Sequence, residues 1–307
     1  MAIKLRYSST ACLYTGLVMR GNWKKTTSKR KAHNHNTVDN RRYRSSFGCS
    51  HVVTAELWRR CASDLPDGAT LEKFHFGLGW LKTYNTEENM CPQLGHMRDK
   101  PPDEQTFRTW SWSTVKCIAD LYDDVIVWEN RKKNDIGNRC LVSVDGSDFP
   151  IAEPSPFWSG WKSPKFGGAG LRYELATGCR TGYLHWTNGP HPAGAMHDLK
   201  IFREWLKWEL DDGERVEADR GYRGEPSCKT PADEHRPERA KMLASVIRNR
   251  HETLNKHFKH FGCMKQVFRH GIEKHGICFR AIAVIVQLSL ELEEPLFEIN
   301  DYDTTDL

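Results

Sequence analysis

The first half of the chain repeats apolar residues at helical spacing. Residues 52–61 predict one helix with Ser50 as its N-cap, and residues 71–84 and 104–128 predict two more. Residues 85–102 are polar and rich in turn formers, which predicts a loop. Three helices ahead of a second domain suggest a helix-turn-helix-like DNA-binding module. A helical cap on that second domain is the alternative.

Two apolar strands in the second half each end beside an acidic residue. Residues 141–148 are apolar as far as Asp145, and Gly146 then breaks the strand pattern. Residues 215–218 form another short apolar run, which ends at Asp219. A buried strand that ends in an acid brings a carboxylate to an exposed edge of a sheet, where sites gather. We therefore expect Asp145 and Asp219 to share a site.

The segments between and after these strands predict the class of the fold. Residues 171–177 and 183–187 are two strands separated by a short turn, which predicts an antiparallel hairpin. A helix that starts at Asp198 precedes the fourth strand, and a long helix over 238–262 follows a loop over 226–237. This order predicts an α/β fold, in which helices pack on a mixed sheet.

The helix over 238–262 brings a third acid. Its apolar stripe can pack on the sheet, whereas Glu252, Lys256 and Lys259 lie on a different, polar face. Arg248 and Arg250 add to its positive charge. A track of DNA phosphates would explain such a helix, and an ordinary solvated face is the alternative.

Composition narrows the class of protein. The chain has 307 residues, a net charge of +5 and a pI of about 8.6, which mildly favours an anionic partner. Its ten Cys are scattered without zinc-ligand spacing, which indicates reduced thiols rather than a secreted disulfide scaffold. No signal peptide is evident, and the apolar run over 281–290 is too short for a membrane span, so we expect a core helix or strand there.

Charge and turn residues divide the chain into four parts. Residues 1–45 form a basic, flexible arm, in which 24–44 are rich in Lys and Arg. Residues 46–135 are the helical region, and 130–139 are a charged linker at its end. Residues 140–297 are the α/β domain, and 298–307 are an acidic tail.

Asp145, Asp219 and Glu252 together suit metal-dependent cleavage of a phosphodiester. Two Mg²⁺ ions about 4 Å apart activate the attacking oxygen and stabilise the leaving one. Mg²⁺ prefers hard oxygen ligands, and carboxylates on rigid strands hold it with little reorganisation. Each acid also has a plainer explanation. Asp145 and Asp219 can form turns before a glycine, and Glu252 can pair with Lys256 on a solvated helix.

Asp198 is a fourth candidate, as a residue that supports the metal ligands. Its position at the start of a predicted helix makes an N-cap the favoured alternative. A carbohydrate-active enzyme could also use paired carboxylates. That class gives no reason for the basic arm and the basic helix.

The same residues resemble a known family in combination. Asp145 precedes Gly146 at a strand, Asp219 lies in an Ala-Asp-x-Gly-Tyr segment, and Glu252 lies in a basic helix. This order is similar to DDE-superfamily endonucleases, and most of all to the Harbinger/IS5-like transposases of eukaryotes. The resemblance covers about residues 40–297, and its segments are 143–148, 165–166, 171–174, 189–190, 198–203, 217–224, 250–256, 268–270 and 273–275. Pro164 departs from the pattern, because the family leads us to expect a His there.

The resemblance implies a fold and an activity. It implies an RNase H-like domain with a catalytic, metal-binding triad at Asp145, Asp219 and Glu252, and two Mg²⁺ or Mn²⁺ ions. Such an enzyme cuts double-stranded DNA at transposon ends and joins the freed 3′ hydroxyl to target DNA. It works in the nucleus as a homo-oligomer, and members of the group often need a Myb-like DNA-binding protein. The cations expected to contact DNA are Lys165, Arg248, Arg250, Lys256 and Lys259.

A second class fits the same residues. A host-retained DNA-binding protein could keep the fold and the basic surface without cutting. The Pro164 departure and the sparse N-terminus favour this alternative, and the complete triad favours the enzyme.

Overall fold

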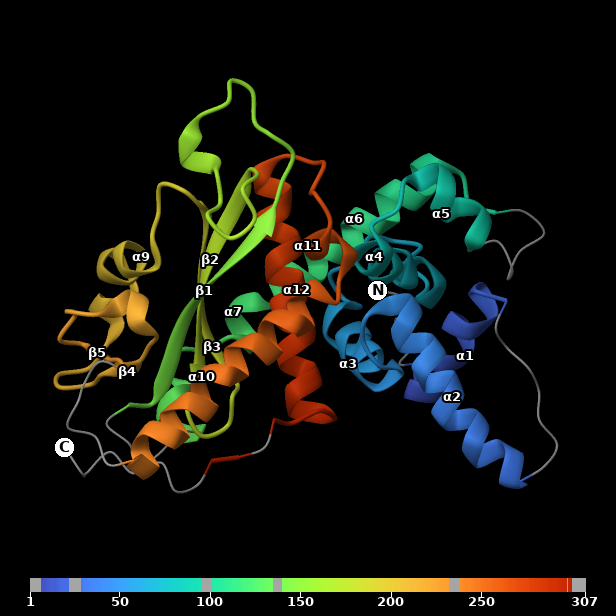
Figure 1. The fold of residues 1–307 in the computed structure, drawn as a ribbon. Coiled ribbons are helices and arrows are strands. Elements are labelled where there is room, and N and C mark those ends of the chain that lie inside the picture. Colours follow the sequence, from blue (N-terminus) through green and yellow to red (C-terminus); the bar gives the residue numbers. More distant parts are fainter. Residues whose placement is uncertain are drawn as a thin grey trace. The chain divides into compact units, whose positions relative to one another are not determined.

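The computed structural model describes residues 7–21, 29–94, 101–134, 140–231, 238–296 and 298–299 (Figure 1). A helical region comes first, and a five-stranded mixed sheet with helices against it follows. The chain forms two compact units. The helical unit runs to Tyr122 and also takes in 260–266 and 277–292, and the remaining residues make up the sheet unit. The predicted domain ranges had placed both of those later segments with the sheet.

The helical unit contains the predicted helices and some that were not expected. Its first six helices are α1 Ser9–Met19, α2 Lys29–Phe47, α3 His51–Cys61, α4 Leu71–Thr83, α5 Glu87–Gln93 and α6 Glu104–Asp120. Ser50 accepts a hydrogen bond from the Val53 amide at 3.1 Å, as an N-cap does. The third predicted helix is interrupted at Leu121, and α7 spans Tyr122–Val125. The predicted loop over 85–102 contains α5, so that prediction was wrong in part.

The prediction of a flexible arm over 1–45 was wrong for its described parts, because α1 and α2 are helices that pack into the unit. Leu17, Tyr43 and Phe47 are buried there. The Tyr43 hydroxyl lies 2.9 Å from Thr54 Oγ1 and 2.7 Å from His75 Nε2. The basic residues had hidden these apolar positions. Lys24 and Lys25 lie outside the described residues.

Two later helices add to the helical unit. α11 is Gly262–Lys265, and the 277–292 part of α12, Ile272–Leu292, belongs to this unit. α12 contains the apolar run over 281–290, which confirms a core element there. By length and composition alone it could cross a membrane, but 67% of its most apolar window is buried inside the protein. This burial is typical of a core helix.

The sheet contains β1 Val142–Pro150, β2 Gly170–Gly178, β3 Leu184–Pro192, β4 Val216–Glu217 and β5 Cys228–Lys229, in the order β3-β2-β1-β4-β5. β2 is antiparallel to β1 and to β3, which confirms the hairpin, and β4 is parallel to β1 and to β5. β5 lies in the predicted loop over 226–237 and was missed. β4 and β5 contribute only two paired residues each, which is too few for a periodic pattern in the sequence.

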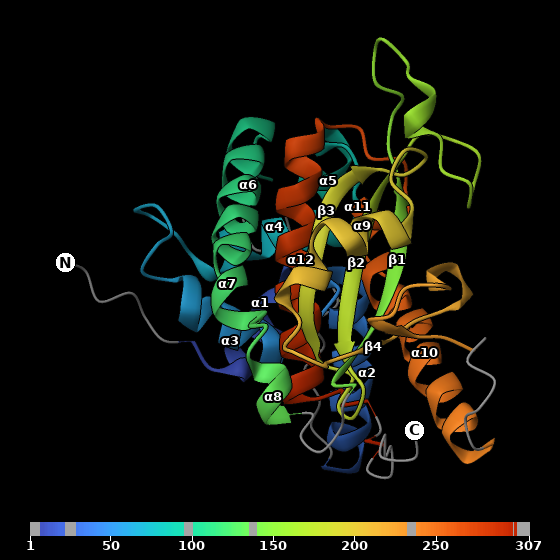
Figure 2. The same cartoon turned by 90° about the vertical axis from the view of Figure 1, so that its left-hand side faces the viewer.

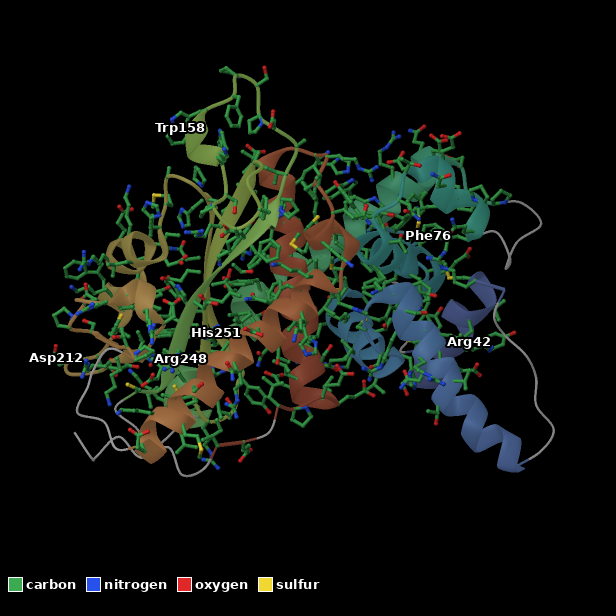
Figure 3. The ribbon with its side chains drawn as sticks, viewed as in Figure 1. Arg42, Phe76, Trp158, Asp212, Arg248 and His251 are labelled. Atoms are coloured by element: carbon green, nitrogen blue, oxygen red, sulfur yellow. The ribbon has the colours of Figure 1, made fainter. Side chains whose placement is uncertain are left out.

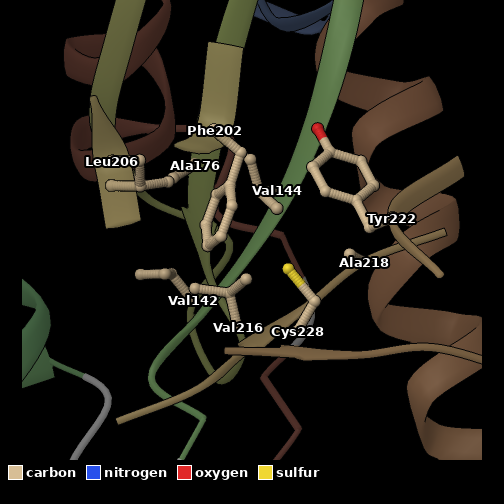
Figure 4. Close-up of a cluster of buried hydrophobic side chains, with 9 residues drawn as sticks. All are labelled: Val142, Val144, Ala176, Phe202, Leu206, Val216, Ala218, Tyr222 and Cys228. Carbon is tan, nitrogen blue, oxygen red and sulfur yellow. The ribbon is translucent and has the colours of Figure 1, made fainter. Parts of the chain in front are cut away.

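One face of the sheet packs on α9, Asp198–Glu204, and the residues that follow it. Figure 4 shows this core, which is formed by Val142, Val144, Ala176, Phe202, Leu206, Val216, Ala218, Tyr222 and Cys228. The long helix α10, Glu238–Lys259, packs against β1 and β4. Figure 2 shows α9 and α10 beside the strands from a second direction.

The predicted linker belongs to the sheet unit as far as it is described. α8 spans Asn130–Asn134. Arg131 is fully buried, with its Nη2 2.8 Å from Glu214 and its guanidinium 3.9 Å from the Trp128 ring centroid. A charged linker was therefore the wrong prediction for this helix. In the predicted tail, the Ile299 amide donates to the Arg180 carbonyl at 3.1 Å, and residues 300–307 lie outside the described residues.

Candidate functional site

The pairing of β1 with β4 brings Asp145 and Asp219 to the same level. Ser143 pairs with Glu217 in this parallel ladder. Asp145 and Asp219 each lie two residues further along, and side chains two apart share one face of a sheet. Neighbouring strands are about 4.8 Å apart. The register therefore brings the chain at Asp145 and at Asp219 to the same level, and the charge of Asp219 is near enough to raise the pKa of Asp145.

Asp145 is not at the end of a strand, as the pattern had predicted. β1 continues through Gly146 to Pro150. A Cβ on Gly146 would lie 1.8 Å from Asp198 Oδ1, so only glycine fits between the strand and that carboxylate. Gly146 thus marks a close contact and not a strand end. Asp219 follows β4 after one residue, Ala218, and its Oδ1 accepts a hydrogen bond from the Gly221 amide at 2.7 Å.

The helix α10 covers the face to which Asp145 and Asp219 belong. His251 Nε2 lies 2.5 Å from the Ser143 hydroxyl, and Arg248 Nη1 lies 3.2 Å from Glu217. Figure 3 shows Arg248 and His251 on α10 beside the strands. Further along, the rings of Phe258 and Phe149 are 6.2 Å apart. The middle of α10 is therefore fixed over the strand segment that holds Asp145.

Burial and neighbouring charges act on Asp145. Burial raises the pKa of Asp145, Lys165 lowers it, and Asp219 raises it again. The Gly146 amide donates to Asp145 Oδ1 at 2.8 Å, which favours the charged form. Two carboxylates that repel one another in a partly buried place are stabilised when a cation binds between them.

Glu252, the third predicted member, is not brought into contact with the other two. It lies on the same side of α10 as Arg248, four residues before it, and Lys259, seven residues after it. Its side chain is exposed. Among the described residues, no group of three or more His, Cys, Asp or Glu side chains is arranged to hold a metal ion. The structure thus joins Asp145 with Asp219 and leaves Glu252 on the adjacent helix.

Two polar residues near the pair were missed by sequence reasoning. Ser147 Oγ and Asn255 Oδ1 are buried, and neither has a hydrogen-bond partner among the described residues. Ser147 lies on β1 two residues after Asp145, and Asn255 lies on α10 one turn after His251. The spacing of three from Glu252 could have pointed to Asn255, because residues three apart share a helix face. Both are buried oxygen atoms on the two elements that flank Asp145, β1 and α10.

The loop between β1 and β2 contributes a cation. Lys165 Nζ donates to the Gly146 carbonyl at 2.5 Å. Ser163 Oγ, two residues earlier, donates to Asp148 at 2.5 Å and accepts from the Lys165 amide at 3.1 Å. Lys165 is thereby held next to Asp145, whose pKa it lowers. Pro164, where we expected a His, lies between these two anchored residues.

Asp198 lies on the other face of the sheet, over Gly146. His197 is the N-cap of α9, so the N-cap explanation for Asp198 was wrong. Asp198 Oδ1 is 3.3 Å from Arg172 Nη1, without the geometry of a hydrogen bond. Arg172 is held by Asp148 at 2.7 Å. Burial raises the pKa of Asp198, Arg172 and Lys165 lower it, and Asp145 raises it. Asp198 therefore acts on Asp145 through charge, which is compatible with a supporting role.

The predicted DNA-binding cations have different surroundings. Lys165, Lys256 and Lys259 are exposed. Partial burial of Lys259 still lowers its pKa, and the charge of Lys165 lowers that pKa further, by less. Arg248 is partly exposed and paired with Glu217. Arg250 is buried, and its Nη1 donates to the carbonyls of Cys179 and Arg180 at 2.9 and 3.0 Å. This placement corrects the prediction for Arg250, because its guanidinium holds a turn and does not face a phosphate.

The donor set suits a hard divalent cation. Asp145 and Asp219 could supply carboxylate oxygens, and Ser147 and Asn255 carry neutral oxygens that lack partners within the described part of the chain. Mg²⁺ and Mn²⁺ accept such ligands and keep several waters, so two carboxylates are sufficient to start a site. Lys165, whose charge lowers the pKa of Asp145, would compete with such a cation.

Comparison with models of protein families, with curated proteins and with solved structures gives no match for this chain. The site must therefore be judged on its own geometry.

Proposed function

We propose that the chain is a divalent-metal-dependent DNA endonuclease of the DDE type, with transposase activity. The observation that supports this most is the register of β1 and β4, which sets Asp145 and Asp219 side by side on the face covered by α10. Glu252 on that helix is the third acid of the proposed triad. The proposed substrate is the end of a transposon in double-stranded DNA.

The residues have distinct parts in the proposed reaction. Asp145 and Asp219 would hold the metal, and Glu252 would complete its ligands once its side chain turns toward the pair. A bound metal supplies Lewis-acid stabilisation of the phosphate and a water or hydroxyl ready to attack. Lys165, Lys256 and Lys259 would bind and orient the DNA backbone through its phosphates. Ser143 and His251 hold α10 in place by their 2.5 Å contact.

The finer points of the proposal come from the resemblance. The antiparallel hairpin, the parallel strands β4 and β5 and the helix over Asp145 suit an RNase H-like domain. The helical unit would then serve as the DNA-binding, helix-turn-helix-like part. We further propose a nuclear location, a homo-oligomer that pairs two DNA ends, and a Myb-like partner. Joining of the 3′ hydroxyl to target DNA would follow cutting at the same site.

Metal-dependent nicking tests the proposal. We expect supercoiled plasmid that carries the DNA flanking this gene to be nicked at repeat ends with Mg²⁺ or Mn²⁺. With chelator the plasmid should stay intact, because two facing carboxylates without a cation cannot activate water at a phosphate. Gel electrophoresis with mapping of the cut ends measures this. Binding of the plasmid with no cut in either metal contradicts an enzyme.

A host-retained DNA-binding protein is the second candidate. The exposed position of Glu252, and the lack of a ready set of three acidic or His ligands within the described ranges, favour it. In that case Lys165, Lys256 and Lys259 would still bind phosphates, and no effect would depend on Asp145 or Asp219. The nicking assay therefore separates the two candidates.

A further inference from the structure

Three large aromatic side chains are exposed on the loop between β1 and β2. Phe157, Trp158 and Phe166 are 52%, 54% and 44% exposed. Exposed aromatic rings cost free energy in water, and several of them on one loop indicate a surface that contacts a partner. Figure 3 shows Trp158 on this loop, which projects past the strands of the sheet.

The loop holds the Trp158 ring in a fixed position. The Trp158 ring lies against Gly160, where a Cβ would come within 2.3 Å of it, and it meets the Trp161 ring edge to face at 6.2 Å. The Gly160 carbonyl accepts hydrogen bonds at 2.9 Å from the amides of Gly194 and Ala195. Rings that are already ordered lose little entropy when a partner stacks on them.

The same loop is anchored beside the carboxylate pair. Lys165 reaches from it to the Gly146 carbonyl, next to Asp145, and Ser163 reaches to Asp148. Phe166 follows Lys165 directly, and its ring packs against Gly170 at the start of β2. The loop has Lys162 and Lys165 against a single acid, Glu153. A negatively charged, flat ligand bound at Lys165 beside Asp145 would therefore lie next to Phe166, and the other two rings are on the same loop.

We propose that Phe157, Trp158 and Phe166 form a stacking platform for an unpaired nucleic-acid base next to the cleavage site. Every base has a flat face that stacks on an aromatic ring, and base–aromatic stacking is a main source of affinity for single strands. In a fully paired duplex these faces are covered by the neighbouring bases. The platform thus favours DNA with an unpaired base beside the cleavage site, a state that a frayed or overhanging end also offers. This inference rests on the proposed function, because it assigns the substrate form to the same site.

Binding of matched DNA ends tests the platform. The probes are a blunt duplex and the same duplex with a few unpaired nucleotides at one 3′ end, in chelator so that nothing is cut. We expect the wild-type chain to bind the overhang about tenfold more tightly, and Trp158→Ala to lose that preference. Trp158→Phe should keep part of it, because a phenyl ring still stacks. Fluorescence anisotropy measures both affinities.

Trp208→Ala is the matched control, because Trp208 is 75% exposed and lies outside the loop. It should bind both probes as the wild type does. A 2-aminopurine placed in the overhang gives a second reading, since its fluorescence is quenched when it stacks on an indole. We expect quenching by the wild type and by Trp208→Ala, and none by Trp158→Ala.

Several results overturn the platform. Equal affinity of the wild type for both probes would overturn it. So would a loss of the overhang preference in Trp208→Ala as large as that in Trp158→Ala. A change of oligomeric mass in Trp158→Ala, with the overhang preference intact, would assign the rings to protein contact. A wild type that nicks plasmid and shows no overhang preference refutes the platform alone. A wild type that binds neither probe and nicks nothing refutes the proposed function as well.

Discussion

Asp219→Asn is expected to lower the rate of DNA nicking by about 100- to 1000-fold. The amide keeps the shape of the side chain, and its oxygen can still accept the 2.7 Å hydrogen bond from the Gly221 amide. It loses the negative charge that a divalent cation needs beside Asp145. DNA affinity should stay within about twofold, because phosphate contacts by cations set that affinity. Nicking time courses and anisotropy titrations measure the two quantities.

Asp212→Asn is the matched control, because Asp212 is an exposed acid on the turn before β4 (Figure 3). It should nick DNA at the wild-type rate. Equal rates in all three proteins would remove Asp219 from the chemistry. A loss of DNA binding in Asp219→Asn would show that the substitution damages more than the metal site.

Glu174→Gln is expected to abolish the loss of stability that Glu174 causes as pH rises from 4.5 to about 8. Burial raises the pKa of Glu174 to about 8, the Trp186 indole lowers it, and Asp198 raises it further. Trp186 Nε1 donates to Oε2 at 3.1 Å, and Oε1 is buried with no partner in the part of the chain that is described. The folded protein thus keeps a proton that the unfolded chain loses above its usual pKa of about 4.5.

The sign of this effect follows from proton linkage. Between pH 4.5 and about 8 the folded state binds more protons than the unfolded state, so stability falls as pH rises through this window. The slope is about 1.4 kcal/mol per pH unit, or roughly 3 kcal/mol over two units inside that window. Gln carries no proton to lose. The variant should therefore match the wild type near pH 5 and exceed it near pH 9.

Denaturant unfolding at several pH values measures this difference. Buried His75, His251 and His275 have lowered pKa values of about 4, 4 and 3, so they remove stability as pH falls below 6.5. This term is common to both proteins and cancels in the difference. Glu153→Gln, at an exposed position, is the control and should not change the profile. A difference between wild type and Glu174→Gln that is constant with pH would contradict the account.

The sheet could be predicted from the sequence to the extent that strands left a pattern. The strands of the β2–β3 hairpin and β1 are nine residues each and were anticipated, whereas β5 has two residues and was missed. The neighbouring positions of β1 and β4 have no local signal, because they depend on how distant segments pair. That Asp145 and Asp219 lie at the same level of neighbouring strands could therefore be seen only from the register.

The errors at charged residues have a common cause. Arg131 was predicted to lie in a charged linker and Arg250 to contact DNA, as part of a basic helix; arginine side chains are mostly exposed. Each is buried because partners are present, which are Glu214 for Arg131 and two carbonyls for Arg250. Gly146 was predicted to break the strand, but it lies within β1 and makes room for Asp198, which lies far along the chain. Partners of this kind appear only when the chain is folded.

Binding of Mn²⁺ to the protein without DNA tests the central claim most directly. Electron paramagnetic resonance of free Mn²⁺ in a titration gives the amount of the ion that each protein binds. The proteins are the wild type, Asp145→Asn, Asp219→Asn and Asp212→Asn. We predict that the wild type and Asp212→Asn retain Mn²⁺, and that Asp145→Asn and Asp219→Asn each lose it. Equal Mn²⁺ retention by all four proteins, or none by the wild type, would contradict a metal site at this carboxylate pair.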